Sequence, residues 1–243
     1  MLQNERKLLE LCYKLYSSTQ IKGALMDYSE LKKNKEIQVY YKKGNDILGK
    51  MGYTDHSVGH AELVAQEAAH ILDYFGYSEH EVELARIAGY LHDIGNAINR
   101  SHHAEYGSLL ANDILKGTDL PLADRVTVVA AIANHDESTG TAVDPVSAAL
   151  IIADKTDVRR NRVRTKDPVM FDIHDRVNYA VVGQNIHCDK EKKSITLNLE
   201  IDESICTMYD YFEIFLGRMV MCRRAAEMLG VTFKLKANGQ KVL

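Results

Sequence analysis

Proline and glycine are scarce in this chain of 243 residues, which has three prolines and 15 glycines. Together with 46% hydrophobic and 26% charged residues, this scarcity excludes a collagenous chain and a mainly disordered one. The first residues lack the apolar segment of a signal peptide. The cysteines form no CxxC pair and lie far apart, at Cys12, Cys188, Cys206 and Cys222. We therefore expect a folded protein of a reducing cytoplasm.

Long apolar runs and a strong excess of one charge are also missing. Segments such as AALIIAD and FLGRMVMC are short and bounded by charges, whereas a membrane-spanning helix needs roughly 20 apolar residues. The formal net charge of −4 gives no general attraction to nucleic acid or to an anionic membrane. We expect no membrane partner and no general nucleic-acid binding, so any binding of phosphate must depend on a local basic patch.

Apolar residues recur at helical spacing from the N-terminus to about residue 179. One such segment contains Leu63, Val64, Ala68, Ile71 and Leu72. This pattern predicts a mainly α fold, with N-terminal helices over residues 1–53 and a helical domain over residues 54–179. Six to eight helices joined by short loops are expected.

The pattern changes to alternation at about Val181. SITLNLEI alternates apolar and polar residues, and the polar run DKEKK separates it from VVGQNIHC, which predicts a hairpin. An amphipathic helix is expected over residues 204–229, and VTFKLKANGQKVL then alternates again around an Asn-Gly turn. Residues 180–243 are therefore predicted to form a small α+β subdomain in β-β-α-β order, to which we assign a role in dimerisation or regulation.

The dipeptide His-Asp occurs three times, and only His92-Asp93 lies within a strongly apolar helical segment, ARIAGYLHDIG. A carboxylate in such a place is costly to bury without a partner. A metal ion is the simplest partner. For this dipeptide alone, the alternative is that Asp93 bonds a neighbouring helix or caps the next one.

Further candidate ligands lie in or beside separate helical segments, at His60, His103, His135 and Asp154. A helix bundle can direct one side chain from each of several helices into a common centre. Imidazole and carboxylate ligands together suit Mn, Fe, Co, Ni or Zn. The sequence thus predicts a site for a divalent transition metal.

The order and spacing of these residues resemble the HD-domain metal-dependent phosphohydrolases, which share a pattern of His, His-Asp and a distal Asp. The resemblance runs from about Asp55 to Arg164 and implies an HD-type helical bundle. By position, it assigns the ligands of one metal ion to His60, His92, Asp93 and Asp154.

Two further histidines, His103 and His135, resemble those of the branches of this family that hold two metal ions, with Asp93 as the bridging carboxylate. HAEYG and ADKTDVRRNR are also similar to the HPExG and ADxxDA stretches of the HD-GYP cyclic dinucleotide phosphodiesterases. Where that branch has HHE and then DGxGYP, this chain has NHDE and STGTAVDP. This departure argues against cyclic di-GMP as a substrate. It also places Asn134 where that branch has a histidine ligand of the second metal ion, a ligand that Asp136 would have to replace.

Two pairs of histidines require a choice. Helical periodicity begins at His60, so we assign the ligand there and interpret His56 as a cap or as a group behind the ligands. The neighbours His102 and His103 cannot both point inward, and the HAEYG register favours His103. No HExxH motif is present, which excludes a zinc protease of that type.

The segment KTDVRRNRVRTK, residues 155–166, contains six basic residues and one acidic residue. On a helix, one stripe would contain Lys155, Arg159, Arg162 and Lys166. Such a stripe is either a solvated, salt-bridged face or, beside Asp154, a phosphate site. We predict that Lys155, Arg159 and Arg162 bind substrate and that the catalytic groups are Asp93, Lys155 and Arg159. Asp157 is expected to orient Lys155 or a ligand histidine.

The resemblance implies an enzyme, a phosphoric monoester or diester hydrolase that uses one or two metal ions to activate water. The expected partner is a small phosphorylated substrate, a nucleotide or a related molecule. The alternative is a nucleotide-sensing or scaffold protein that retains the metal site with little turnover. Aromatic and methionine side chains of residues 204–229 are assigned to the core or to a homodimer interface.

Overall fold

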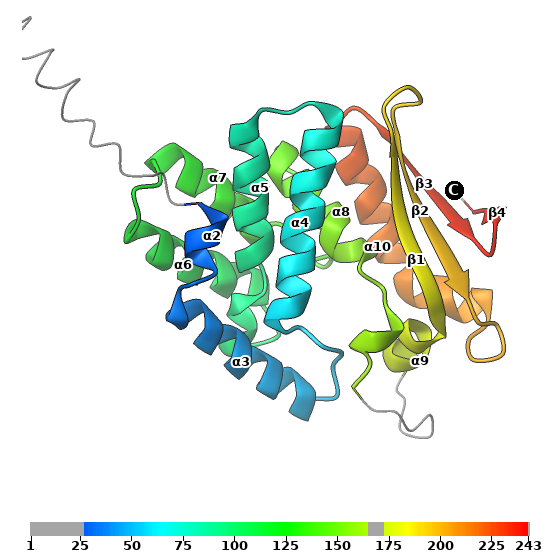
Figure 1. Cartoon of the computed structure of the whole chain (residues 1–243). Coiled ribbons are helices and arrows are strands. Elements are labelled where there is room, and N and C mark those ends of the chain that lie inside the picture. Colours follow the sequence, from blue (N-terminus) through cyan, green and yellow to red (C-terminus); the bar gives the residue numbers. More distant parts are fainter. Residues whose placement is uncertain (1–26, 165–172, 243) are drawn as a thin grey trace, which may run out of the picture.

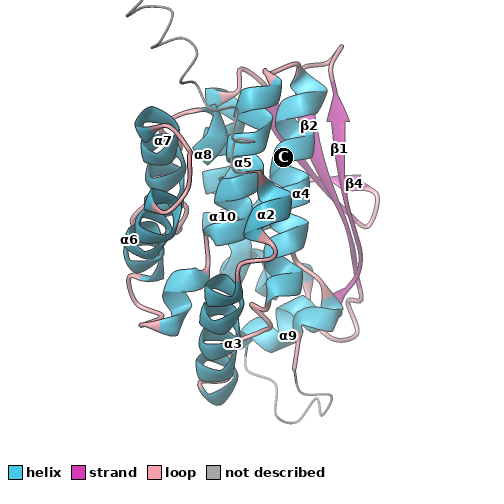
Figure 2. Ribbon diagram, turned by 60° about the vertical axis from the view of Figure 1, so that its left-hand side comes forward, coloured by secondary structure: helices cyan, strands magenta, loops and turns pink. Residues whose placement is uncertain are grey.

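The computed structural model describes residues 27–164 and 173–242, which form a helical bundle with a small sheet along one side (Figures 1 and 2). Its first part contains α2 (Tyr28–Leu31), α3 (Lys35–Lys50), α4 (Val58–Phe75), α5 (Glu79–Leu91), α6 (His103–Lys116), α7 (Leu122–Ala133), α8 (Pro145–Thr156) and the short 3-10 helices η1 (Ile94–Ala97) and η2 (Arg160–Arg162). The predicted mainly α fold is confirmed. The part of the predicted N-terminal helices that falls on residues 1–26 lies outside the described residues.

The second part contains α9 (Ile173–Ala180), β1 (Val181–Asp189), β2 (Ser194–Ile201), α10 (Met208–Met228), β3 (Thr232–Ala237) and β4 (Gln240–Lys241). The predicted β-β-α-β order is confirmed, and the two-residue strand β4 follows the predicted Asn238-Gly239 turn. β1 and β2 pair antiparallel, whereas β2 and β3 pair parallel. A parallel pair needs a crossover connection, and α10 supplies it.

Local sequence signals fix the ends of the helices that position the site. α5 begins with a capping box, in which the Ser78 hydroxyl accepts a hydrogen bond from the backbone N–H of Glu81 while the Glu81 carboxylate accepts one from the N–H of Ser78. α8 begins with a similar box between Asp144 and Ser147, and Pro145 occupies its first turn. These caps set where α5 and α8 begin along the chain.

Helices α4 and α5 approach each other closely because small residues line their contact. A Cβ atom on Gly89 would lie 2.7 Å from the Cα of Ala65. Ala61, Ala65 and Ala88 are fully buried along the same contact. This close packing brings the start of α4 beside the end of α5, and the rings of His60 and His92 lie 5.2 Å apart there.

Helix α8 lies at the centre and contacts α4, α5, α7 and α10. All residues from Val146 to Ala153 are buried, as expected for a helix whose residues are almost all apolar around its circumference. α10 covers α8 with Phe215, Met219 and Cys222 and also contacts β2 and β3. The C-terminal part is therefore packed directly on the helical bundle. None of the helices in the described residues is long and apolar enough to cross a membrane.

Candidate metal centre and substrate pocket

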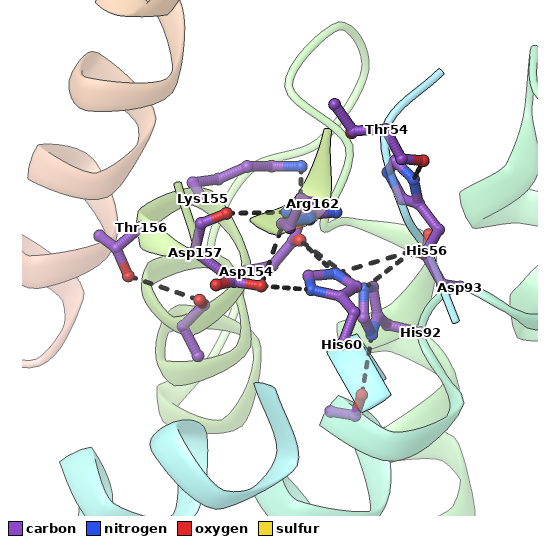
Figure 3. Close-up of polar contacts among 12 residues, drawn as sticks. Thr54, His56, His60, His92, Asp93, Asp154, Lys155, Thr156, Asp157 and Arg162 are labelled. Carbon is purple, nitrogen blue, oxygen red and sulfur yellow. Dashed lines mark hydrogen bonds and ion pairs between the residues drawn. The ribbon is translucent and has the colours of Figure 1, made fainter. Parts of the chain in front are cut away.

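The six predicted ligands lie in or directly beside five helices and meet in one cluster near the ends of α5 and α8. Figure 3 shows four of them, His60, His92, Asp93 and Asp154. The six are His60 in the first turn of α4, His92 and Asp93 at the end of α5, His103 at the start of α6, His135 after α7, and Asp154 near the end of α8. All of them are buried except Asp154, whose side chain is 12% exposed. His102, the neighbour of His103, is exposed.

Four of these side chains converge on one point. His60 Nε2 lies 3.3 Å from Asp154 Oδ1 and 3.8 Å from Asp93 Oδ2. His92 Nε2 lies 3.4 Å from Asp93 Oδ2 and 3.7 Å from Asp154 Oδ1. Within the described residues, His60, His92 and Asp154 form one group of candidate metal ligands, and His92, Asp93 and His135 form a second. The structure therefore brings each of these two groups, which share His92, close enough together to hold a cation.

The Nδ1 atoms of the four histidines all donate away from the cluster. His92 Nδ1 lies 2.8 Å from the carbonyl oxygen of Gly89, and His135 Nδ1 lies 2.6 Å from that of Ile132. His103 Nδ1 lies 3.1 Å from the carbonyl oxygen of Arg100, and His60 Nδ1 lies 2.6 Å from Asp157 Oδ2. Because carbonyl and carboxylate oxygens only accept here, each ring in its neutral form carries its proton on Nδ1, and its Nε2 lone pair is then free for a metal.

Unpaired buried atoms show that these residues fit a cation. Nε2 of His60, His92 and His135 and Oδ2 of Asp93 are all buried without a hydrogen-bond partner. Leaving such atoms unsatisfied is costly. They belong to the two candidate ligand groups, and divalent cations bound there would satisfy their lone pairs. Nitrogen and oxygen ligands in this combination suit a transition metal rather than Ca²⁺ or Mg²⁺.

The electrostatics of the cluster favour positive charge. Burial alone would lower the pKa of His92, but the carboxylates of Asp93 and Asp154 raise it to about 10. Burial opposes ionisation of Asp93, yet His92 and the neighbouring histidines hold the pKa of this carboxyl well below its usual range. The two carboxylates therefore stay ionised and stabilise a proton or a cation between them.

His103 faces the cluster with Nε2, whereas Asp136 lies on the opposite side of the His103 ring. His103 Nε2 is 3.7 Å from Asp93 Oδ1, on the cluster side. Asp136 Oδ2 is 3.7 Å from the opposite nitrogen of His103, Nδ1, and it belongs to neither candidate ligand group of the described residues. The Asn134 amide donates to the carbonyl of Ala130 on its own helix.

Asp157 orients one of the ligands. Besides accepting from His60, its carboxylate pairs with the guanidinium of Arg159, and its carbonyl accepts from Arg162 Nη1 at 2.7 Å. Burial opposes ionisation, but the hydrogen bonds of His60 and Arg159 hold the pKa of Asp157 far below its usual range. Of the two predicted partners of Asp157, the structure selects the histidine.

The predicted helical stripe over residues 155–166 is wrong. α8 ends at Thr156, and only the 3-10 turn η2 follows. The β-branched residues Thr156 and Val158 disfavour helix, and the buried ion pairs of Asp157 require a bend of the chain. Lys166 lies outside the described residues.

A small polar cavity of about 30 Å³ lies beside the cluster. Its walls include the cluster residues Asp93, His103 and Asp154, and the neutral or imidazole side chains Thr54, His56 and Asn178. Four cationic side chains complete it, namely Arg100, Lys155, Arg162 and Arg218. Every lining residue is polar or charged.

The predicted phosphate-binding residues fall into two groups. Lys155 Nζ lies 2.7 Å from Asp154 Oδ2 at the cavity, and Arg162 is held at its wall by the carbonyls of Asp157 and Asp55. Arg159 instead pairs with Asp157 and lines a separate cavity between α4 and β1. Arg159 therefore does not lie at the cluster of candidate ligands, where the predicted helical stripe had placed it.

The sequence analysis did not predict that Arg100 and Arg218 line the cavity, and it interpreted His56 as a cap or as a group behind the ligands. Arg100 lies in the short segment between His92-Asp93 and His103, a position that could have signalled its role. Arg218 lies on α10, more than 60 residues after the last predicted ligand, and no local pattern marks it. His56 Nδ1 lies 2.8 Å from the Thr54 carbonyl, and its ring packs edge-on against His60 at the cavity wall.

Residues 53–161 match the model of the HD domain family. This match contains all six candidate ligands, whose order resembles the pattern of that family. An uncharacterized protein of Methanocaldococcus jannaschii is 30% identical over 175 residues, which are 61% of this chain and 66% of that protein. The crystal structure of a predicted HD superfamily hydrolase from an uncultured Thermotogales bacterium covers 55% of this chain and 75% of its own, with 24% identity and a TM-score of 0.41.

Proposed function

We propose that this protein is a metal-dependent phosphohydrolase that cleaves a phosphate ester or anhydride of a small molecule. One observation carries the proposal. Three imidazole nitrogens and one carboxylate oxygen are buried without partners, directly beside a cavity with four cationic side chains. The first feature suits a metal ion and the second suits the oxygens of a phosphoryl group. The HD domain supports the same class of reaction.

His60, His92, Asp93 and Asp154 would hold the metal, drawn from Mn, Fe, Co, Ni or Zn. When bound, a divalent cation supplies a Lewis acid and lowers the pKa of water at the site. The residues of the chain do the rest. The Nδ1 hydrogen bonds hold the ligand rings in place, and this orientation removes the need to reorder them on binding.

Lys155 and Arg162 are proposed to bind the phosphoryl oxygens. Lys155 is buried against Asp154, so its ammonium lies between a metal ligand and the cavity. Two carbonyl bonds fix the guanidinium of Arg162 at the wall. Fixed positive groups stabilise the charge that develops on phosphoryl oxygens without reorganisation. Neither a serine nor a cysteine nucleophile is required.

A nucleotide is one candidate substrate. The cavity contains no aliphatic lining residue, so the base of a nucleotide would lie outside it and only the phosphate would be bound there. The alternative is an HD-domain sensor with little turnover, which would bind the same ligands and release no product.

The experiment is metal analysis of the purified chain combined with phosphate release from monoesters, diesters, nucleotides and diphosphates in the presence of each of the five metals. Asp93→Ala should lose bound metal and activity together. Asp73→Ala, at an exposed position of α4, is the matched control and should keep both. Full metal-dependent activity in Asp93→Ala, or binding without product release from any substrate in the wild type, would contradict the proposal.

A further inference from the structure

Arg218 brings a cation from outside the HD domain into the substrate cavity. The family match ends at residue 161, whereas Arg218 lies on α10 and lines the cavity beside Asp93 and Asp154. Its Nε donates to Glu137 Oε2 at 3.1 Å, and its guanidinium lies over the ring of Phe215. Since Nε alone makes the bond to Glu137, the two terminal nitrogens of the guanidinium remain to bind an anion.

Arg100 is a second cation at this cavity, and it lacks an acidic partner in the described part of the chain. Its Nη1 donates to the neutral side chain of Asn96 at 3.2 Å, and its guanidinium lies 5.4 Å from the ring centroid of Tyr53. Its carbonyl accepts from His103 Nδ1, so the backbone at Arg100 is fixed to a candidate ligand. An uncompensated guanidinium at a partly buried site is poised for an anion.

A single phosphate group does not account for all of these cations. Lys155 and Arg162, which lie beside the cluster of candidate ligands, are sufficient to bind the oxygens of one phosphoryl group. Arg100 adds a guanidinium without an acidic partner in the described residues, and Arg218, although its Nε is paired with Glu137, adds two terminal nitrogens to a cavity whose lining contains two carboxylates, Asp93 and Asp154. The fully polar lining also contains no phenylalanine, tyrosine, tryptophan or aliphatic side chain against which an aromatic base would pack. The excess charge and the polarity together match a compact, highly anionic substrate.

We infer that Arg100 and Arg218 form a second phosphate subsite and that the substrate is a small compound with a diphosphate group. This inference rests on the proposed function. In the reaction, the oxygen of water bonds to the phosphorus of the phosphoryl group beside the candidate ligands. The bond from this phosphorus to the oxygen that bridges the two phosphates breaks. The electron pair of that bond stays with the departing phosphate, which also takes up a proton from the water. Arg100 and Arg218 bind the departing phosphate.

The test measures binding of methylenediphosphonate and methylphosphonate to the manganese-loaded protein by calorimetry. The wild type should bind methylenediphosphonate at least ~10-fold more tightly, which corresponds to about 1.4 kcal/mol. Arg100→Gln and Arg218→Gln should each remove most of this preference while methylphosphonate affinity changes less than about 2-fold. Arg224→Gln, an exposed arginine on the same helix α10, is the matched control and should leave both affinities unchanged.

A purely structural role of Arg218 in docking α10 predicts a different result. Glu137→Ala would then reproduce Arg218→Gln, and both probes would weaken equally in each variant. Either that outcome or an unchanged preference in both Arg100→Gln and Arg218→Gln overturns the inference.

Parallel assays of phosphate release from pyrophosphate and from p-nitrophenyl phosphate distinguish failure of the second subsite from failure of the proposed function. Turnover of p-nitrophenyl phosphate without any preference for methylenediphosphonate contradicts the second subsite and is consistent with the proposed function. A diphosphonate preference that depends on both arginines supports the subsite, even if no substrate releases phosphate and the proposed function fails.

Discussion

His60 Nδ1 and Asp157 Oδ2 lie 2.6 Å apart, although 97 positions separate the two residues in the sequence. Both residues are buried. Through this bond the segment after α8 fixes the ring of a ligand at the start of α4, and Nε2 of the ring faces Asp93 and Asp154. The candidate metal centre is therefore held by a contact between the two ends of the segment that matches the HD domain.

Asp157→Asn should weaken metal binding while preserving the fold. The amide has the shape of the carboxylate but loses its charge, so it holds the donor tautomer of His60 less strongly. Loss of such an outer partner typically lowers metal affinity about 10- to 100-fold. Metal titration followed by calorimetry measures the change, with Asp73→Asn as the control. An unchanged affinity would show that Asp157 does not orient the ligand.

Gly95→Ala should destabilise the protein. A Cβ at this position would lie 2.0 Å from the carbonyl oxygen of His103 and 2.4 Å from the backbone nitrogen of Gly107, so η1 and α6 would have to separate. Overpacking of this kind costs about 3 kcal/mol. Urea unfolding measures the difference in the free energy of unfolding.

Gly217→Ala is the opposite change and the matched control. A Cβ on Gly217 meets no atom within 4 Å, and the residue lies in the interior of α10. Alanine is favoured over glycine in helices by about 0.8–1.0 kcal/mol, so the variant should be slightly more stable than the wild type. Equal stabilities of Gly95→Ala and Gly217→Ala would refute the close approach of η1 and α6.

Asp55 should contribute to stability only while it is ionised. Burial opposes ionisation, but the hydroxyl and amide of Ser57, the amide of Asn45 and the charge of Arg164 lower the pKa of Asp55 below 3.8. A lowered folded-state pKa gives a contribution that is full above the unfolded pKa and is lost as the pH falls through the folded value. Asp55→Asn should therefore cost about 1 kcal/mol at pH 7.

The same variant should cost less near pH 3, because protonation of this carboxyl in the unfolded state then offsets part of the advantage that ionisation gives the folded state. Urea unfolding at both pH values tests this, with Asp73→Asn as the control. A cost that is the same at both pH values would mean that the contacts of Asp55 act without its charge.

Buried thiols should react slowly in the folded protein. Burial raises the pKa of Cys188 to about 11 and that of Cys222 to about 12, and Cys206 is buried as well. The thiolate is the reactive form, so a Cys12→Ser variant should show little reaction with a thiol reagent at pH 8. After unfolding, all three remaining cysteines should react. Rapid labelling in the folded state would contradict the burial of these side chains.

The clustering of the candidate ligands could be predicted from the order of these residues and from their setting in the sequence. Asp93 is an acid in an apolar helical segment, and Asp154 lies near the end of a helix with buried residues from Val146 to Ala153. The order of these residues along the chain adds a family pattern. The alternation of SITLNLEI likewise predicts β2, since its apolar residues, such as Leu197, are buried.

Contacts between distant segments could not be predicted in this way. The position of Arg218 in the cavity depends on how α10 packs against α8, which no spacing within residues 204–229 encodes. The error over residues 155–166 has the same origin. Periodicity favours a helical stripe there, but the bond between His60 and Asp157 and the backbone contacts of Arg162 bend the chain instead.

The cover that α10 provides for α8 has a consequence for biosynthesis. Every candidate ligand lies before residue 155, yet the apolar surface of α8 that meets Phe215 and Cys222 is buried only once α10 is in place. A nascent chain on the ribosome would thus contain every candidate ligand while α8 is still uncovered and prone to aggregation, until α10 emerges. We therefore expect the candidate site to reach its final geometry only after the crossover helix has been translated.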